Sequence, residues 1–397
     1  MDIVIGKPYI RRIEERNAFQ LCSDIQGVGE PFTLWYEVEN NIKEYLFTER
    51  SDAFLIGLLP YAMAHSTDRN PLIIKCEAPV SEKLYYQLKA HYIPALSKNI
   101  IWYHNVKIET ELENKLFKSA YAVGTGVSGG VDSFYTLLNS KENSCRFQIT
   151  HGLYFEYDPS ELFYNEMNNK MRELSQNICL EFGINFVSIK SNICSKVYHV
   201  AHEAIITCML LSYVYSLQKL FKIYYFSSGH TYDSFKIVSH SSELYNLLNV
   251  HCLSTESMYL YTTGSEVIRW EKTNYIADFD LPRKYLMVCR SPKVINGVLK
   301  NCSRCSKCTR TMIDLDLVGK LNYFSSIFDV GAYRKNPNYY LGYLSFKGKK
   351  DAYVAETLNL IKNTGKHFPI CARIAGIKKL IKNGFKRGNP LQYDYRP

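Results

Sequence analysis

The middle of the chain alternates between short apolar runs and longer amphipathic stretches. Runs rich in β-branched and aromatic residues predict strands, and the stretches between them predict helices, because the two patterns repeat about every two and every 3.6 residues. The predicted order is strand, helix, strand, helix, strand, helix, strand, at residues 120–127, 134–138 and onward, 147–155, 160–181, 184–189, 204–217 and 222–226. Such alternation indicates a doubly wound α/β domain, in which helices cover both faces of a parallel sheet.

The first 115 residues follow a different pattern. Apolar runs at 32–38 and 72–76 predict strands, and 53–65 and 81–92 predict helices, the second with a serine at its start. No nucleophile, base and metal ligand come together in this stretch of sequence. We therefore predict an N-terminal α+β accessory domain that shapes the substrate site, forms a homodimer or contacts a partner protein.

The chain has 397 residues, more than one ordinary core accommodates, so we expect several domains. We divide it into an accessory domain at 1–115, an α/β domain at 116–320 and a mostly helical, basic extension at 321–397. A hydrophobic fraction of 46% and a charged fraction of 22% are typical of a globular protein. No signal peptide and no membrane span is evident, so twelve cysteines favour thiols or metal ligands in a cytoplasmic protein without a membrane partner.

The net charge of +10 is unevenly distributed. Between residues 373 and 396, seven basic residues stand against one acidic residue. Such a tail can contact RNA, an acidic partner or a nucleotide, although a solvated helix face is the simpler interpretation. RNA is not favoured as a partner, because the chain has no dedicated RNA-binding motif.

Six residues follow the first predicted strand of the α/β domain: Ser128-Gly129-Gly130-Val131-Asp132-Ser133. A glycine-rich turn between a strand and a helix is typical of a phosphate-binding site, because the first N–H groups of a helix have no intrahelical partner and the helix dipole favours an anion. The two hydroxyls add donors, whereas a carboxylate beside phosphate requires a divalent cation between them. The loop therefore predicts a nucleotide bound with Mg²⁺.

Other interpretations of the loop compete with this one. Gly124, Gly126 and Gly129 also fit the G-x-G-x-x-G fingerprint of dinucleotide-binding folds. Those folds use an acidic residue after the second strand, where Glu156 is the nearest candidate. A Walker P-loop is excluded because no Gly-Lys-Ser/Thr follows the glycines. A purely structural turn would explain the glycines but not Asp132 and both serines together.

Cys302, Cys305 and Cys308 have the spacing C-x-x-C-x-x-C. A tight turn of this kind brings three sulfur atoms onto one ion, and tetrahedral zinc needs a fourth ligand, for which Cys289 is the nearest upstream candidate. The reserve ligands are His251 and Cys252. Four sulfur ligands leave no open position, so the metal would be structural. An iron–sulfur cluster and scattered reduced thiols are the alternatives.

The loop sequence SGGVDS resembles the PP-loop signature S-G-G-x-D-S of the ATP pyrophosphatase superfamily. A PP-loop at the start of a domain and a C…CxxCxxC group at its end are together similar to the 7-cyano-7-deazaguanine synthase (QueC-like) branch. The resemblance covers residues 118–318, roughly half of the chain, and neither end. It implies a PP-loop (HUP-like) doubly wound sheet.

The resemblance also implies an activity. Members of the superfamily cleave ATP to AMP and pyrophosphate, and they transfer AMP to a carbonyl, carboxylate or amide oxygen that ammonia, an amine or sulfur then attacks. By the match, Ser128, Asp132 and Ser133 are the catalytic residues, and together with Gly129 and Gly130 they bind the outer phosphates and Mg²⁺. The four cysteines hold Zn²⁺.

The extra domains and the longer cysteine spacing are typical of a diverged QueC-like branch, parts of which act in antiphage defence or specialised biosynthesis. The deazaguanine substrate is therefore not carried over, and we expect a small molecule, a peptide or a protein as acceptor. A sulfurtransferase acting on RNA or a metabolite, and a noncatalytic nucleotide-binding subunit, are the competing functions.

Ligands of open α/β sheets bind at the carboxyl ends of the strands. We therefore expect Val127, Tyr154 and Phe155 to contact adenine, although a core position explains Phe155 equally well. Arg269 and Lys272 lie in a charged segment and could supply positive charge to the α-phosphate, unless they belong to a surface helix.

Two pairs of residues remain as candidates for the acceptor site. His230 and Asp233 follow the last predicted strand and are the stronger candidates for substrate binding. His199 and His202 lie three apart on a predicted helix, where local hydrogen bonds are the simpler explanation.

Overall fold

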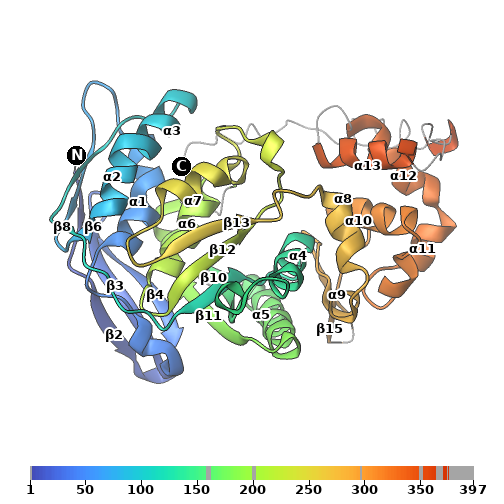
Figure 1. The fold of residues 1–397 in the computed structure, drawn as a ribbon, viewed down its shortest axis with the longest axis horizontal. Coiled ribbons are helices and arrows are strands. Elements are labelled where there is room, and N and C mark those ends of the chain that lie inside the picture. Colours follow the sequence, from blue (N-terminus) through green and yellow to red (C-terminus); the bar gives the residue numbers. More distant parts are fainter. Residues whose placement is uncertain are drawn as a thin grey trace. The chain divides into compact units, whose positions relative to one another are not determined.

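The computed structural model describes residues 2–157, 162–198, 203–295, 297–347, 352–363, 370–372 and 374. These residues form two compact units (Figure 1). Unit 1 consists of the described residues within Met1–Gly126 and Ser140–Thr263. Unit 2 consists of those within Val127–Asn139 and Gly264–Tyr393.

Unit 1 is an α/β structure built on one large sheet. Its strands are β1 (Ile3–Ile5), β2 (Tyr9–Ile13), β3 (Ala18–Gln26), β4 (Phe32–Glu39), β5 (Ile73–Cys76), β6 (Val80–Ser81), β7 (Lys107–Glu109), β8 (Leu112–Glu113), β9 (Ala122–Gly126), β10 (His151–Tyr157), β11 (Asn185–Ser191), β12 (Phe221–Ser227) and β13 (Tyr259–Thr263). Its α-helices are α1 (Asp52–His65), α2 (Glu82–Gln87), α3 (Ile93–Asn99), α5 (Leu162–Phe182), α6 (Ile206–Tyr215) and α7 (Asn246–Cys252).

The strand order across the large sheet is β13-β12-β9-β10-β11-β4-β3-β1-β5-β7, with β2 beside β3, while β6 and β8 pair separately. The five strands from β13 to β11 are all parallel, as the alternating pattern predicts for β9 to β12, whereas β13 was not predicted from the sequence. The strand order reverses at β9. Because crossovers between parallel strands are right-handed, α5 and α6, which cross in opposite directions, lie on opposite faces of the sheet (Figure 1).

The N-terminal strands continue the same sheet. β4 pairs with β11 in antiparallel fashion, with Glu37 opposite Lys190. Beyond the end of β11, the side chain of Asn192 accepts a hydrogen bond from the Trp35 N–H (3.0 Å) and donates one to the Thr33 carbonyl (2.9 Å). Unit 1 therefore extends through the boundary that the sequence suggested at residue 115, because strands on both sides of it share one sheet.

Helix α1 lies in the core of unit 1. Its residues from Asp52 to Met63 are buried apart from Tyr61, as expected for a helix that is apolar on every face. A Cβ atom on Gly57 would lie 2.9 Å from Cδ1 of Ile193 and 3.2 Å from Cβ of Ser212 on α6. Glycine at this position therefore allows the close approach of the two helices.

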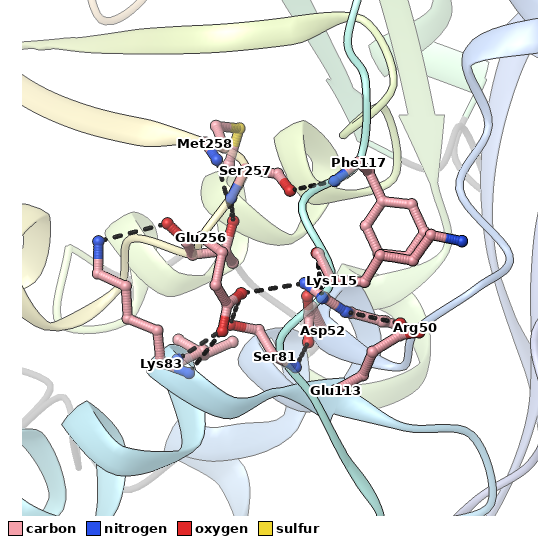
Figure 2. A network of polar contacts seen from close by, with 12 residues as sticks. Arg50, Asp52, Ser81, Lys83, Glu113, Lys115, Phe117, Glu256, Ser257 and Met258 are labelled. Carbon is pink, nitrogen blue, oxygen red and sulfur yellow. Dashed lines mark hydrogen bonds and ion pairs between the residues drawn. The ribbon is translucent and has the colours of Figure 1, made fainter.

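A buried ion-pair network joins the loop before α1 and the strands β6 and β8 to the loop before β13 (Figure 2). The Arg50 side chain is fully buried, and its guanidinium lies 3.2 Å from Glu113 Oε2 and 3.1 Å from Glu256 Oε2. It also lies over the Phe117 ring, 4.7 Å from the centroid. Glu256 accepts a further hydrogen bond from the Ser81 hydroxyl (2.7 Å). The network therefore connects segments that are far apart in the chain, since Arg50 and Glu256 are 206 positions apart.

Replacing the buried arginine tests the importance of this network. Arg50→Met should lower the free energy of unfolding by about 3 kcal/mol, because it leaves the largely buried Glu256 carboxylate without its cation. Glu113→Gln should cost about 1 kcal/mol or less, since Glu113 is 32% exposed and water screens its charge. Chemical denaturation of the full-length chain measures both values, and equal losses would contradict a buried pair at Arg50 and Glu256.

Unit 2 consists mainly of helices. Its elements are α4 (Val131–Ser140), α8 (Arg269–Ile276), α9 (Asp280–Tyr285), β14 (Lys293–Ile295), β15 (Val298–Lys300), α10 (Ser306–Leu317), α11 (Val330–Lys335), α12 (Pro337–Lys347) and α13 (Ala352–Asn363). The described residues after Lys320 are largely helical, and they belong to the same unit as residues 264–320. Apart from Ile374, the basic tail at 373–396 lies outside the described residues, as do His199 and His202. Among the helices that the structure describes, none combines the length and the apolar character needed to cross a membrane.

Candidate active site and metal centre

A tight turn leads from β9 into α4. Gly129 has a φ of 70°, in the left-handed region where a side chain would strain the backbone. Its carbonyl accepts a hydrogen bond from the Met287 N–H over 2.7 Å. The strand, glycine-rich turn and helix that the sequence predicts are therefore present, and the segment just before the cysteines holds the turn.

Both serines of the turn hydrogen-bond to its backbone. The Ser133 hydroxyl accepts a hydrogen bond from the Ser128 N–H over 3.3 Å. The Ser128 hydroxyl accepts one from the Gly130 N–H over the same distance, 3.3 Å. Ser133 is buried, whereas Ser128 is exposed. Ser133 therefore fixes the shape of the turn, and Ser128 is an exposed residue of it.

Asp132, in the first turn of α4, pairs with two cations from α8. Its Oδ2 contacts Nη1 of Arg269, and its Oδ1 lies 3.4 Å from Nζ of Lys272. The side chains of Asp132, Arg269 and Lys272 are 21%, 10% and 1% exposed, so water screens the pairs weakly. The structure thus brings together the three charged residues that the sequence assigned to phosphate and Mg²⁺.

Burial and the neighbouring charges shift the pKa values of Asp132 and Lys272. Burial alone would raise the pKa of Asp132, but the neighbouring charges of Arg269 and Lys272 outweigh burial and hold the pKa below its ordinary value. Burial lowers the pKa of Lys272, against the opposing charge of Asp132. Glu266 also acts on Lys272, and Glu356 on both cations, so carboxylates and cations alternate in this group.

The residues predicted to contact adenine already contact other parts of the protein. Val127 is buried. The Tyr154 hydroxyl donates to the Asn168 carbonyl (3.3 Å), and the Phe155 ring packs edge-on against Tyr213 with centroids 5.5 Å apart. Tyr154 and Phe155 belong to unit 1, whereas the turn belongs to unit 2, and the role of these residues toward adenine remains a prediction.

The predicted acceptor residues also belong to unit 1. His230 lies in the loop after β12, where its N–H donates to the Ser228 hydroxyl (3.2 Å), and Asp233 is exposed in the same loop. Glu156, which a dinucleotide fold would leave free for a ribose, pairs instead with Arg172 and Lys190, each at 3.2 Å. Its side chain is 7% exposed, so this environment does not suit the dinucleotide interpretation.

The four cysteines Cys289, Cys302, Cys305 and Cys308 come together in unit 2, with all four sulfur atoms within 4.8 Å of one another. The sulfur of Cys305 lies 3.9 Å from that of Cys289 and 3.4 Å from that of Cys308. Zn–S bonds of about 2.3 Å in a tetrahedron place sulfur atoms roughly 3.8 Å apart. The group can therefore hold a metal ion, and Cys289 is the fourth member in place of the reserve ligands.

Backbone N–H groups point at these sulfur atoms. The N–H of Cys302 donates to the sulfur of Cys289, and that of Cys305 to the sulfur of Cys302, each over 3.3 Å. The N–H of Cys308 donates to the sulfur of Cys305 (3.5 Å) at the start of α10. Donors of this kind stabilise thiolates, which are the form that binds metal.

Sequence patterns did not mark two of the residues that support the turn. They are Met287, through its N–H to Gly129, and Glu356 on α13, whose Oε2 accepts from the Arg269 N–H over 2.9 Å. Neither belongs to a motif, and each acts through a contact between segments distant in the chain. Comparison with protein-family models, curated proteins and solved structures finds no match for this chain.

Proposed function

We propose that the chain is an ATP-dependent enzyme of the PP-loop class that forms AMP and pyrophosphate. The observation that carries the proposal is the contact of Arg269 and Lys272 with Asp132, in the first turn of the helix that follows the glycine-rich loop. In the proposed complex, Mg²⁺ takes the Asp132 carboxylate and the phosphates of ATP take the two cations. Charge that develops on the departing pyrophosphate is then stabilised by groups already in place.

In the proposed reaction, ATP activates a carbonyl, carboxylate or amide oxygen of the acceptor. An oxygen of the acceptor attacks the α-phosphorus, the bond to pyrophosphate breaks, and a nitrogen nucleophile then displaces AMP from the adenylated carbon. The strand order of unit 1, which reverses at β9, supports the PP-loop (HUP-like) assignment, because doubly wound sheets have such a reversal. The QueC-like assignment rests on the combination of this turn with the four cysteines.

Products of labelled ATP test the activity. Protein incubated with Mg²⁺ and ATP labelled at the α-phosphate, together with ammonium and a panel of carboxylic acids, amides and peptides, should release labelled AMP and free pyrophosphate. Release of ADP and phosphate would contradict the proposal. Transfer of sulfur to the acceptor would instead identify a sulfurtransferase, and tight ATP binding without turnover on any acceptor would favour a noncatalytic subunit.

We propose that the cysteine cluster holds structural zinc. Four sulfur ligands leave no position for substrate, and the positive charges of Arg304 and Lys307 lie close in sequence to offset the thiolates. Metal analysis of protein purified without chelator should give about one zinc per chain and a colourless sample. A brown sample with iron and acid-labile sulfide would contradict zinc and support an iron–sulfur cluster.

A further inference from the structure

Glu356 of α13 caps the helix that carries Arg269. Arg269 is the first residue of α8, and its backbone N–H donates to Oε2 of Glu356 over 2.9 Å. The preceding residue, Ile268, has an apolar side chain that cannot accept such a bond. Because the first N–H groups of a helix lack intrahelical partners and lie at the positive end of its dipole, a carboxylate from another helix fixes where α8 begins.

Tyr353, which lies three residues before Glu356, contacts two guanidinium groups. Its ring centroid is 5.8 Å from Cζ of Arg269 and 4.4 Å from Cζ of Arg310 on α10. The Arg269 side chain is 10% exposed, and Arg310 is 6% exposed, so these cation–π contacts are weakly screened. Tyr353 therefore restricts the guanidinium that reaches Asp132.

Helix α13 is anchored independently of Arg269. The Thr357 hydroxyl donates to Oδ1 of Asp314 on α10 over 2.8 Å, and both residues are buried. α10 is also the helix that carries Cys308. Because α13 is held by α10, it can present Tyr353 and Glu356 to Arg269 in a fixed position.

We propose that Glu356 and Tyr353 are positioning residues of the phosphate site, so that α13 is a working part of nucleotide binding. The inference rests on the proposed function, since it takes Arg269 as a side chain that binds phosphate. A guanidinium that is already held in one conformation loses less entropy when phosphate binds. Loss of the two contacts therefore weakens nucleotide binding although neither residue contacts the nucleotide.

The dissociation constant of Mg²⁺-ATP, measured by calorimetric titration of the full-length chain, tests this role. Glu356→Ala and Tyr353→Ala should each weaken binding roughly five- to ten-fold. Glu356→Gln keeps an oxygen acceptor and Tyr353→Phe keeps the ring, so both should recover most of the affinity. Lys362→Ala, at an exposed position of the same helix, is the matched control and should bind as the wild type does.

A double-mutant cycle distinguishes positioning from a general loss of stability. In an Arg269→Met background, Glu356→Ala should weaken binding by less than about two-fold, because the side chain that it positions is gone. Equal losses in both backgrounds would overturn the proposal. If Glu356→Ala does not fold, the same cycle with Tyr353→Ala decides the question.

The two proposals fail in different ways. A wild-type chain that binds no Mg²⁺-ATP would refute the proposed function and this inference together. A wild-type chain that binds Mg²⁺-ATP, with Arg269→Met binding equally well, would refute only the role of Arg269 and α13. Unchanged affinity in folded Glu356→Ala and Tyr353→Ala variants would refute the positioning role alone.

Discussion

Asp132→Asn is expected to abolish AMP formation, with a loss of about 10²–10³-fold or more, while the fold is retained. The amide has nearly the shape of the carboxylate and can still accept a hydrogen bond from Arg269, but it lacks the negative charge that holds Mg²⁺. Initial rates of labelled AMP release, with circular dichroism to verify folding, measure the effect. Turnover at the wild-type rate would remove the turn from the mechanism.

A matched control and the pH dependence sharpen this test. Asp278→Asn removes an aspartate of unit 2 that is 60% exposed and pairs with Lys320, and it should leave the rate unchanged. Since the pKa of Asp132 is lowered in the folded chain, its pair with the two cations is complete above the ordinary pKa of an aspartate. The stability that the pair contributes should be lost only as the pH falls through that lowered pKa.

Removal of the proposed zinc is expected to have the second large effect, on both stability and nucleotide binding. Cys308 is buried at the start of α10, and Met287, two residues before Cys289, donates to the carbonyl of Gly129. A cysteine cluster without its metal should therefore release α10 and loosen the phosphate turn. Structural zinc contributes of order 10 kcal/mol in small zinc domains, so several kcal/mol should be lost here.

Cys308→Ser, or incubation with a strong chelator, tests this coupling. The melting temperature should fall, and Mg²⁺-ATP binding, measured by titration below that temperature, should weaken by at least an order of magnitude. Cys145→Ser, at an exposed cysteine outside the cluster, is the control and should change neither quantity. A chelated protein that melts lower but binds Mg²⁺-ATP normally would show that the metal stabilises unit 2 without holding the turn.

The alternating region was predictable because its strands and helices carry local periodic signals. The strand predicted at 184–189 is β11, and the helix predicted at 53–65 is α1. The helix expected at 81–92 begins after Ser81, as predicted, but continues through a π-helical turn into α3. Boundaries were less predictable. The strand predicted at 147–155 begins only at His151, because the apolar Phe147 lies in a 3₁₀ turn four residues before β10.

Pairings between distant segments were not predictable from local patterns. The strands β2 and β3 have mixed polar and apolar sequences, and β1 has only three residues. Nothing local specifies that β4 pairs with β11. The same holds at the candidate site. The spacing of Cys302, Cys305 and Cys308 marks the metal group, whereas the contact of Glu356 with Arg269 joins residues 87 positions apart and has no sequence signature.

The structure of a complex with Mg²⁺ and a nonhydrolysable ATP analogue tests the central claim most directly. The account predicts that the β- and γ-phosphates lie against residues 128–133, with Mg²⁺ on Asp132 and with Arg269 and Lys272 turned from the carboxylate to phosphate oxygens. A turn that stays empty at saturating nucleotide, with both cations still on Asp132, would contradict it. So would a nicotinamide dinucleotide bound there in preference to ATP.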